Sequence, residues 1–233
     1  GSPTPRSGSS PVEQIFDLLR QLRPLLMAQF GPGPAPEIFG TDGALEAQLR
    51  GVLDQVRPED LNVSVANSTS IRARSGIAYQ EVYSGPEMTV CIFALRSGAV
   101  IPLHDHPGMH VFGRLLYGRM RVASFDPEPT SSEQGVFGPR YALRRDDKII
   151  GPEPTTYDLG PDDGNLHELH AIDHCAFFDV LTPPYDGRSG RNCTYYRQES
   201  PDPKQPQRCL LQPVDIPGFS MDFQKYNGPV FVV

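Results

Sequence analysis

The sequence contains no uninterrupted run of about 18 apolar residues, the length from which a membrane-spanning helix is predicted. It also has no excess of positive charge, since 21 lysines and arginines stand against 28 acidic residues and the formal net charge is −7. We therefore expect no membrane span and no nucleic acid partner, and an anionic membrane surface is disfavoured for the same reason. A cationic substrate is compatible with this sign.

Cysteine is also scarce, and its four residues form no Cys-x-x-Cys pair: Cys91, Cys175, Cys193 and Cys209. A chain of 233 residues can bury enough apolar surface to fold as one domain without disulfides. We therefore expect reduced thiols and a cytoplasmic location, with the nucleus as a further location. A monomer is also expected. The opening Gly1-Ser2, without an initiator methionine, is interpreted as a cloning remnant.

Two amphipathic helices are predicted near the N-terminus. Residues 1–11 are rich in Ser, Pro and Gly, which predicts disorder. From Val12 onward, apolar residues at helical spacing predict a helix that Pro24 ends or kinks, followed by a Gly-Pro linker. We accordingly expect a partly disordered segment over 1–40 and a single domain over 41–233. The second helix opens that domain and packs on its outside through an apolar stripe: Leu45, Leu49, Val52, Leu53 and Val56.

Short apolar segments separated by turn residues predict an all-β domain. Glycine and proline are both frequent, with 22 and 25 residues, as expected for many turns between short strands. The charged segment Tyr141–Ile150 is expected to form a solvated edge hairpin. The predicted strands are Ile77–Tyr83, Thr89–Leu95, Ala99–Leu103, His110–Tyr117, Arg119–Phe125, Thr155–Leu159, Leu166–Ile172, Ala176–Thr182, Cys193–Arg197 and Cys209–Val214.

The stretch Ile101–Val111 contains a candidate metal site. His104 and His106 lie two residues apart at the end of a predicted strand. Side chains two apart on a strand point to the same face, so the pair can present two imidazoles to one metal ion. Asp105 points to the opposite face and is not expected to be a ligand. Two histidines on an ordinary loop are the alternative interpretation.

Glycines around this pair favour the metal site. Gly98 precedes His104 by six residues, and Gly118 closes the next apolar segment. This spacing resembles the first cupin motif, which continues with a glutamate ligand four or five residues after the second histidine. The chain has His110 and Val111 at those positions. If the chain is a cupin, histidines alone hold the metal.

A third ligand is expected from a later strand. Gly164 precedes His167 by three residues, which matches the core of the second cupin motif. His170, of opposite strand parity, and His174 are the alternatives. The position of the turn glycine favours His167.

Five segments carry a more specific resemblance: Ile101-Pro-Leu-His-Asp-His-Pro-Gly-Met109, Leu116-Tyr-Gly118, Asn165-Leu-His167, Phe178-Asp-Val-Leu-Thr-Pro-Pro-Tyr185 and Cys193-Thr-Tyr-Tyr196. In this order they resemble the family of thiol dioxygenases that contains cysteamine (2-aminoethanethiol) dioxygenase and plant cysteine oxidase. The resemblance extends from about Leu45 to Pro229. It implies a cupin fold, a jelly-roll-like double-stranded β-helix barrel with the N-terminal helices packed outside. It also implies iron(II), Fe(2+), held by three histidines, and conversion of a thiol to a sulfinic acid by O2.

The residues are compatible with that chemistry. Three neutral imidazoles leave an octahedral ferrous ion with three open positions. An aminothiol can take two positions through sulfur and nitrogen with O2 in the third, or its thiolate can take one while water persists. Zinc fits the same ligands but has no redox chemistry, so only the resemblance implies iron.

Asp179 and Tyr185 are the candidate catalytic and substrate-binding residues. Asp179 lies in a predicted strand that is apolar on both faces, where an unpaired carboxylate is unfavourable. It either binds the ammonium group of the substrate, or pairs with Arg114 or Arg119, or hydrogen-bonds to a ligand histidine. Tyr185 either lines the same mouth or packs as a cap on the barrel.

Cys193 and Tyr195 share one face of a predicted strand. The resemblance implies a Cys–Tyr thioether at this motif as one alternative, and two unmodified side chains as the other.

The leading functional hypothesis is a non-haem iron thiol dioxygenase that oxidises the N-terminal cysteine of proteins or peptides to cysteine sulfinic acid. In this family such oxidation marks a target for the N-degron pathway and links protein lifetime to oxygen sensing in hypoxia. Oxidation of free cysteamine to hypotaurine is the alternative within the class. A non-catalytic metal-binding cupin that acts as a sensor is the alternative from another class.

Overall fold

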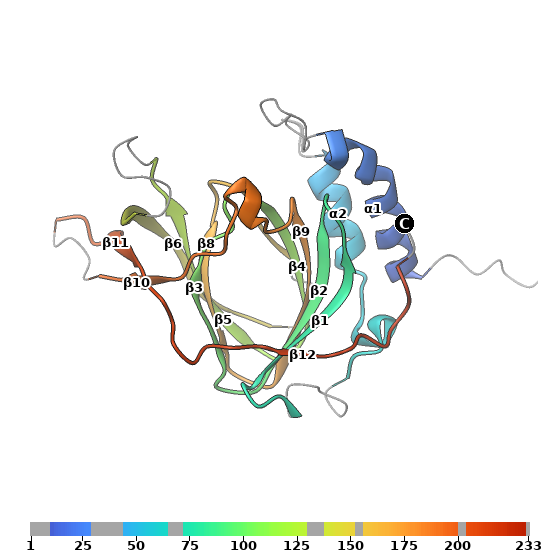
Figure 1. The fold of residues 1–233 in the computed structure, drawn as a ribbon. Coiled ribbons are helices and arrows are strands. Elements are labelled where there is room, and N and C mark those ends of the chain that lie inside the picture. Colours follow the sequence, from blue (N-terminus) through green and yellow to red (C-terminus); the bar gives the residue numbers. More distant parts are fainter. Residues whose placement is uncertain are drawn as a thin grey trace, which may run out of the picture.

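Two β-sheets face each other across an internal cavity, and two α-helices lie on the outer side of one sheet (Figure 1). In this computed structural model, residues 10–28, 44–64, 72–129, 138–151, 156–199 and 204–231 are described. The helices are α1 (Pro11–Ala28) and α2 (Ala44–Leu53). Within those ranges, no helix combines the length and the apolar character needed to cross a membrane.

The first sheet lies against the helices and has the strand order β12-β1-β2-β9-β4-β7. Its strands pair antiparallel, except that β12 runs parallel to β1. The carboxyl-terminal segment therefore becomes an edge of this sheet. The strands are β1 (Ile77–Ser84), β2 (Thr89–Leu95), β4 (His110–Tyr117), β7 (Thr156–Leu159), β9 (Cys175–Thr182) and β12 (Asp222–Phe223).

The second sheet has the order β10-β11-β6-β5-β8-β3. The described strands thus form two separate hydrogen-bonded sheets rather than one closed barrel. This two-sheet jelly-roll arrangement, with helices outside, confirms the expected cupin fold. The strands are β3 (Val100–His104), β5 (Met120–Pro127), β6 (Arg140–Ile150), β8 (Leu166–Ala171), β10 (Tyr196–Gln198) and β11 (Arg208–Pro213), and two short 3-10 helices are η1 (Pro58–Leu61) and η2 (Gly187–Ser189).

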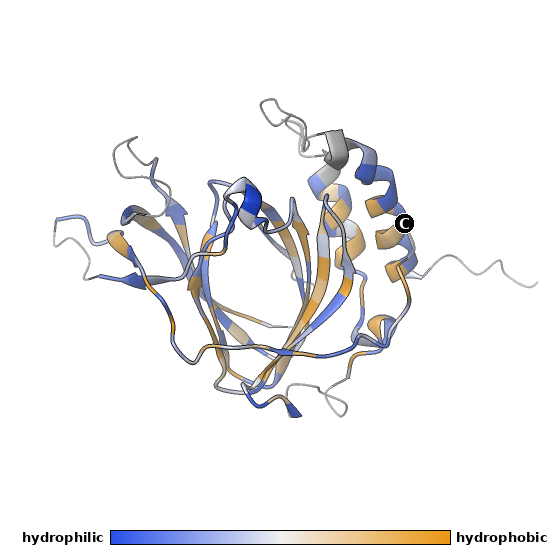
Figure 2. Ribbon diagram, viewed as in Figure 1, coloured by the Kyte–Doolittle hydropathy of each residue, from blue (hydrophilic) through white to orange (hydrophobic). Residues whose placement is uncertain are grey.

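The apolar sides of the helices cover the outer face of the first sheet, as Figure 2 shows. Ile15 and Leu19 of α1, and Leu49 and Leu53 of α2, are almost fully buried in one cluster with strand residues such as Phe112. Full burial of one such side chain stabilises the fold by about 1.5–3 kcal/mol. The apolar spacing that predicts each helix is therefore also what attaches it to the sheet.

Strand β9 contributes side chains both to the helix-covered face of the first sheet and to the cavity. All of its residues are buried. Because side chains alternate along a strand, Phe178 and Val180 join the cluster beneath the helices, whereas Phe177, Asp179 and Leu181 line the cavity between the sheets. Coverage of both faces explains why this strand is apolar almost throughout.

Several sequence predictions differ from the structure. The predicted strand Cys193–Arg197 is observed only as β10 from Tyr196 onward, so Cys193 and Tyr195 precede the strand and do not share one of its faces.

Helix α1 continues through Pro24 to Ala28, so of the two alternatives for Pro24, the one in which it ends the helix is wrong. Proline removes a single backbone donor, and here it does so at an exposed position about one turn from the helix end. Most of the predicted disordered segment 1–11 and the Gly-Pro linker lie outside the described residues, but Pro11 is already helical.

Two further differences concern strands. The segment Tyr141–Ile150 forms one long strand, β6, whose first four residues pair with β11. The expected solvated edge hairpin holds only for its charged part from Arg144 onward, which pairs antiparallel with β5 and is largely exposed. Strand β12 was not predicted. With only two residues it has no alternating pattern, and its pairing with β1 depends on a long-range contact.

Candidate metal centre and substrate cavity

Three histidines from two segments come together on the cavity-facing side of the second sheet. His104 ends β3 and lies directly opposite His167 of β8 in the antiparallel register. His106 follows His104 by two residues and turns to the same side. Their ligand atoms all lie within 4.8 Å of one another, and all three side chains are buried. The structure thus brings together the three residues that the spacing selects.

Hydrogen bonds on the far sides of the rings orient two of these imidazoles. His104 Nδ1 lies 2.8 Å from the carbonyl oxygen of Pro102, to which it can donate. His106 Nδ1 lies 2.8 Å from the hydroxyl of Tyr185, which in turn donates to the carbonyl oxygen of Asp105 at 2.7 Å. Each contact favours the tautomer that leaves Nε2 without a proton. This is the usual way in which proteins fix histidine ligands for a metal.

The same rings are held in their neutral form. Burial lowers the pKa of His104 to about 4. Burial, followed by the neighbouring imidazoles, holds the pKa values of His106 and His167 well below the usual value for histidine. Neutral imidazole is the form that binds metals, so the cluster is ready for a cation without loss of protons.

The spacing of the nitrogens fits one shared ion. His106 Nε2 and His167 Nε2 are 3.2 Å apart. Two nitrogens bound to one ion at about 2.1 Å lie about 3.0–3.4 Å apart in octahedral or tetrahedral geometry. The buried three-nitrogen set therefore suits a divalent transition metal.

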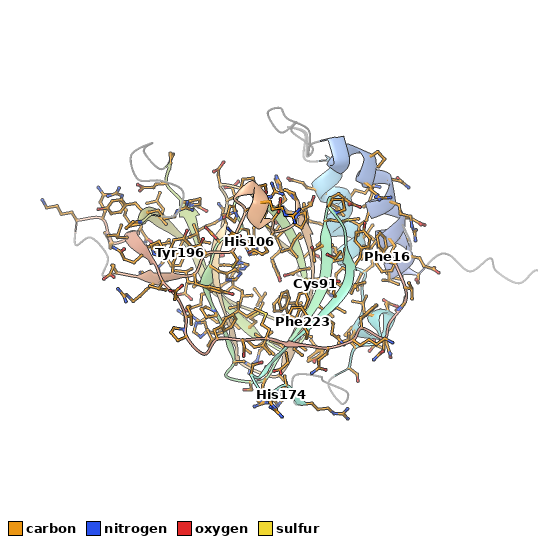
Figure 3. All side chains as sticks on the ribbon, in the orientation of Figure 1. Phe16, Cys91, His106, His174, Tyr196 and Phe223 are labelled. Carbon is orange, nitrogen blue, oxygen red and sulfur yellow. The ribbon has the colours of Figure 1, made fainter. Side chains whose placement is uncertain are left out.

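The cavity in front of the histidines has a volume of about 210 Å³. Figure 3 labels His106, which follows β3, and Cys91, which lies on β2 of the opposite sheet. The cavity walls are largely apolar and include Phe93, Ile101 and Leu181. Its polar lining comprises the three histidines and Asp179 of β9, together with a thiol and three phenols: Cys193, Tyr79, Tyr185 and Tyr195.

Asp179 faces this cavity from the first sheet and has a partner that the sequence did not indicate. Tyr157 of β7 donates a hydrogen bond from its hydroxyl to Asp179 Oδ1 at 2.7 Å. The Asp179 side chain is 6% exposed.

Of the two arginines considered as partners of Asp179, Arg119 pairs instead with Asp173 on the surface. Arg114 lies opposite Phe178 in the register of β4 and β9, and Phe178 belongs to the cluster beneath the helices, not to the cavity.

Gly113 makes the contact between Tyr157 and Asp179 possible. Strand β4 lies between β7 and β9, and Gly113 is paired with Tyr157 on one side and with Asp179 on the other. A β-carbon at position 113 would collide with the Tyr157 ring. Glycine within a strand often marks such a close approach, and here the ring crosses the strand where no side chain stands.

Asp179→Asn is expected to change how stability depends on pH. Burial raises the pKa of Asp179 to about 7, and the Tyr157 hydrogen bond offsets only part of that rise. The folded state therefore holds the proton more tightly than the unfolded chain. The resulting stabilisation is complete below about pH 4 and is lost as the pH rises through about 7. Relative to the variant, the wild type should lose up to about 4 kcal/mol of unfolding free energy between pH 4 and pH 8.

Urea unfolding of the metal-free proteins at both pH values measures this difference. The histidines titrate in both proteins, so their contribution to the pH dependence cancels in the comparison. Asp162→Asn, at an exposed carboxylate, is the control. A parallel pH dependence of the wild type and Asp179→Asn would contradict the burial argument.

Cys193, Tyr185 and Tyr195 meet at the rim of the cavity. The Cys193 thiol contacts both phenols, and burial raises the pKa of Cys193 to about 11. Tyr185 also stacks on the His106 ring, with centroids 5.4 Å apart. Tyr185 therefore both lines the cavity and supports a histidine, while the thioether between Cys193 and Tyr195 stays a prediction.

The alternative histidines lie elsewhere. His170 points to the other face of β8, where Nε2 is 2.6 Å from Glu168 Oε2. His174 accepts a hydrogen bond from the Ser97 amide in a turn. His110 is half-buried near Asp158 and Asp163 and is not part of the three-histidine cluster.

Two positioning residues were missed. Asn165 is buried and clamps the backbone of His106: Oδ1 accepts from the amide at 3.1 Å, and Nδ2 donates to the carbonyl at 2.7 Å. Asp105, on the opposite face from the histidines, accepts from the Thr194 amide and the Tyr196 hydroxyl, both at 2.8 Å. The signal for the first was its place two residues before a ligand, in the segment Asn165-Leu-His167 that also carries the family resemblance. The orientation of the second follows from strand alternation, because Asp105 lies between two ligand histidines and so points to the opposite face.

The fold and this site define a cupin with a buried three-histidine centre that faces a carboxylate across a small cavity. A family model described as PCO_ADO matches residues 52–231, and the chain belongs to this family. One relative, "Plant cysteine oxidase 2" of Arabidopsis thaliana, is 33% identical over 190 residues, which cover 80% of this chain and 66% of that protein. Another, "2-aminoethanethiol dioxygenase" of Mus musculus, is 35% identical over 189 residues, which cover 72% of each chain.

The chain spans 66% and 65% of the lengths of two Arabidopsis thaliana relatives, the plant cysteine oxidases 2 and 1. Among solved structures, KdgF from Halomonas sp. matches with a TM-score of 0.35 and 17% identity, over 48% of this chain and 84% of that one. An RmlC-like cupin from Desulfovibrio desulfuricans matches with a TM-score of 0.33 and 14% identity, over 46% and 83%.

Proposed function

We propose that this protein is an iron(II)-dependent thiol dioxygenase that oxidises the N-terminal cysteine of proteins or peptides to cysteine sulfinic acid. The observation that carries the proposal is the placement of three neutral imidazoles and a buried carboxylate on opposite walls of one small cavity. Membership of the PCO_ADO family, with relatives named as cysteine and 2-aminoethanethiol oxidising enzymes, supports the same reaction class.

His104, His106 and His167 would hold the metal. A ferrous ion bound there would supply O2 activation and would favour the thiolate form of the substrate. The reaction is balanced as R–SH plus O2 giving R–SO2H, in which sulfur loses four electrons and both oxygen atoms come from O2. No carboxylate is among these three ligands, and of the described residues that line the cavity, Asp179 is the acidic one.

Asp179 is assigned to the substrate ammonium group. Tyr157 occupies Oδ1, so we assign Oδ2 to the ammonium ion. A carboxyl with a pKa near 7 is poised to ionise when a cation enters, because an opposite charge close by favours the carboxylate. Cysteamine and an N-terminal cysteine share this arrangement of an amine two carbons from a thiol. In the protein substrate, we propose that oxidation feeds the N-degron pathway and makes target lifetime depend on O2.

We assign Tyr185 two roles, one in orienting a ligand histidine and one in contacting the substrate. Its hydroxyl fixes the orientation of His106, while its ring forms part of the cavity wall. The Tyr185 ring thus excludes water from the region beside the metal position. The Tyr185 hydroxyl keeps Nε2 of His106 pointing toward the metal position.

The deciding experiment is anaerobic loading with Fe(2+), addition of a Cys-initiated peptide and then O2, followed by mass spectrometry of the peptide. We expect a gain of two oxygen atoms on the cysteine. The same peptide with an acetylated N-terminus lacks the ammonium group and should react at least tenfold more slowly. The spectrum of the protein itself tests the Cys193–Tyr195 thioether, which would remove two hydrogen atoms.

Three other outcomes would lead to a different conclusion. Oxidation of cysteamine together with inert peptides would favour the hypotaurine-forming alternative. Retained peptide affinity without oxygen gain would favour a metal-binding sensor. A peptide that neither binds nor reacts would contradict the proposal.

A further inference from the structure

We propose that the segment Val214–Phe223 forms a groove that binds the residues following the N-terminal cysteine of a peptide substrate and favours an apolar side chain at position 2 or 3. This inference rests on the proposed function and extends it to the part of the substrate that does not react. The segment, called the strap below, leaves β11 of the second sheet and crosses to β12 at the edge of the first sheet, as Figure 1 shows.

The size of the metal cavity limits what it can hold. At about 210 Å³ it lies below the range of about 300–1,000 Å³ that encloses drug-sized ligands. It can accept the thiol and amine of one residue but not several residues of a peptide. The remainder of a peptide substrate must therefore lie outside the cavity.

A second hollow begins where the cavity ends. It has a volume of about 520 Å³ and shares three residues with the metal cavity: Tyr195, Met221 and Phe223. The two spaces are thus continuous over one rim. A peptide whose first residue reaches the histidines is directed along the strap by this continuity.

The groove is largely apolar and preformed. Phe219 follows a turn in which its amide donates to the Ile216 carbonyl at 3.2 Å, and the left-handed Gly218 after Pro217 is typical of a type II turn. The turn places the Phe219 ring edge-on against Tyr195, with centroids 5.4 Å apart. A surface ordered before binding loses less conformational entropy when a ligand docks.

Both ends of the strap are attached to the sheets. The Val214 amide donates to the Tyr195 carbonyl at 2.9 Å, and the Gln224 amide donates to the Tyr79 carbonyl at 2.9 Å. Phe223 rests edge-on against Tyr79 with centroids 5.0 Å apart. The strap is therefore held at a fixed distance from the cavity rim.

Phe223 indicates the chemistry of the occupant. Its side chain is 81% exposed although it borders both hollows. An exposed aromatic ring at the rim of an apolar groove gains most by covering an apolar side chain. The one charged residue that lines the groove is Asp215, which disfavours acidic residues beside it. The chemistry thus selects an extended peptide with an apolar, non-acidic residue after the cysteine.

The test compares two Cys-initiated peptides, one with phenylalanine at positions 2 and 3 and one with glycine there. We expect Fe(2+)-loaded wild type, kept anaerobic, to bind the phenylalanine peptide about tenfold more tightly by calorimetry. Phe223→Ala should remove most of that preference. After O2 is added, the change should appear in KM and not in kcat.

Two further variants complete the design. Phe219→Ala should reduce the same preference from the other end of the groove. Ile149→Ala, at a 61% exposed apolar residue of β6 that lines neither hollow, should keep it. Equal affinity of the wild type for the two peptides, or a preference unchanged in both strap variants, would overturn the groove. Because binding is measured without O2, a peptide that binds selectively but is never oxidised would instead refute the proposed activity.

Discussion

His167→Ala is expected to lose bound iron and to lower thiol oxidation by at least about 1,000-fold. His167 supplies one of three buried ring nitrogens, and its Nε2 lies 3.2 Å from that of His106. Its removal leaves two ligands, and among the described residues that line the cavity no other nitrogen ligand replaces it. Iron content per chain, measured after desalting, and peptide oxidation by mass spectrometry are the two readouts.

The matched control is His170→Ala, which removes the same side chain three residues later on the same strand. His170 lies on the opposite face, beside Glu168. This variant should keep its iron and its activity within about twofold of wild type, as is usual for a surface substitution. If both variants lost iron equally, the third ligand would have been assigned wrongly.

Asp179→Asn is expected to lower kcat/KM for a Cys-initiated peptide by about 100-fold while the protein stays folded. A buried carboxylate that meets an ammonium ion contributes about 1.5–3 kcal/mol through a charged hydrogen bond, and about 2.7 kcal/mol corresponds to 100-fold. Asparagine keeps the shape and can still accept from Tyr157, so the lost feature is the charge.

A thiol substrate without an amine separates binding of the ammonium group from a general defect. Wild type and Asp179→Asn should differ by less than about threefold on such a thiol, because no ammonium ion is present to pair with the carboxylate. Comparable losses on both substrates, or a variant that unfolds at all pH values tested, would show that Asp179 is structural.

The metal site could be predicted from the sequence because it depends on local rules. Strand alternation places His104 and His106 on one face, and the same rule separates His167 from His170. The turn at Gly164, which has a positive φ, sets where β8 begins. The cross-strand pairing of His104 with His167 adds the one long-range contact that the motif order implies.

The surroundings of Asp179 could not be predicted, because they depend on strand order. Its burial follows from the apolar strand around it, but Tyr157 is 22 residues away along the chain and two strands away in the sheet. Strand order also decides that β12 crosses to β1 and that β11 covers the start of β6. None of these pairings leaves a periodic pattern in the sequence.

The missing side chain at position 113 has an evolutionary consequence. A larger residue there and the present position of the Tyr157 ring are incompatible, because the added β-carbon would collide with the end of that ring. Enlarging Gly113 therefore displaces the Tyr157 ring or requires a smaller residue at position 157, and in either case Asp179 loses its phenol donor. We expect positions 113 and 157 to vary together, and the acidity of Asp179 to change with them.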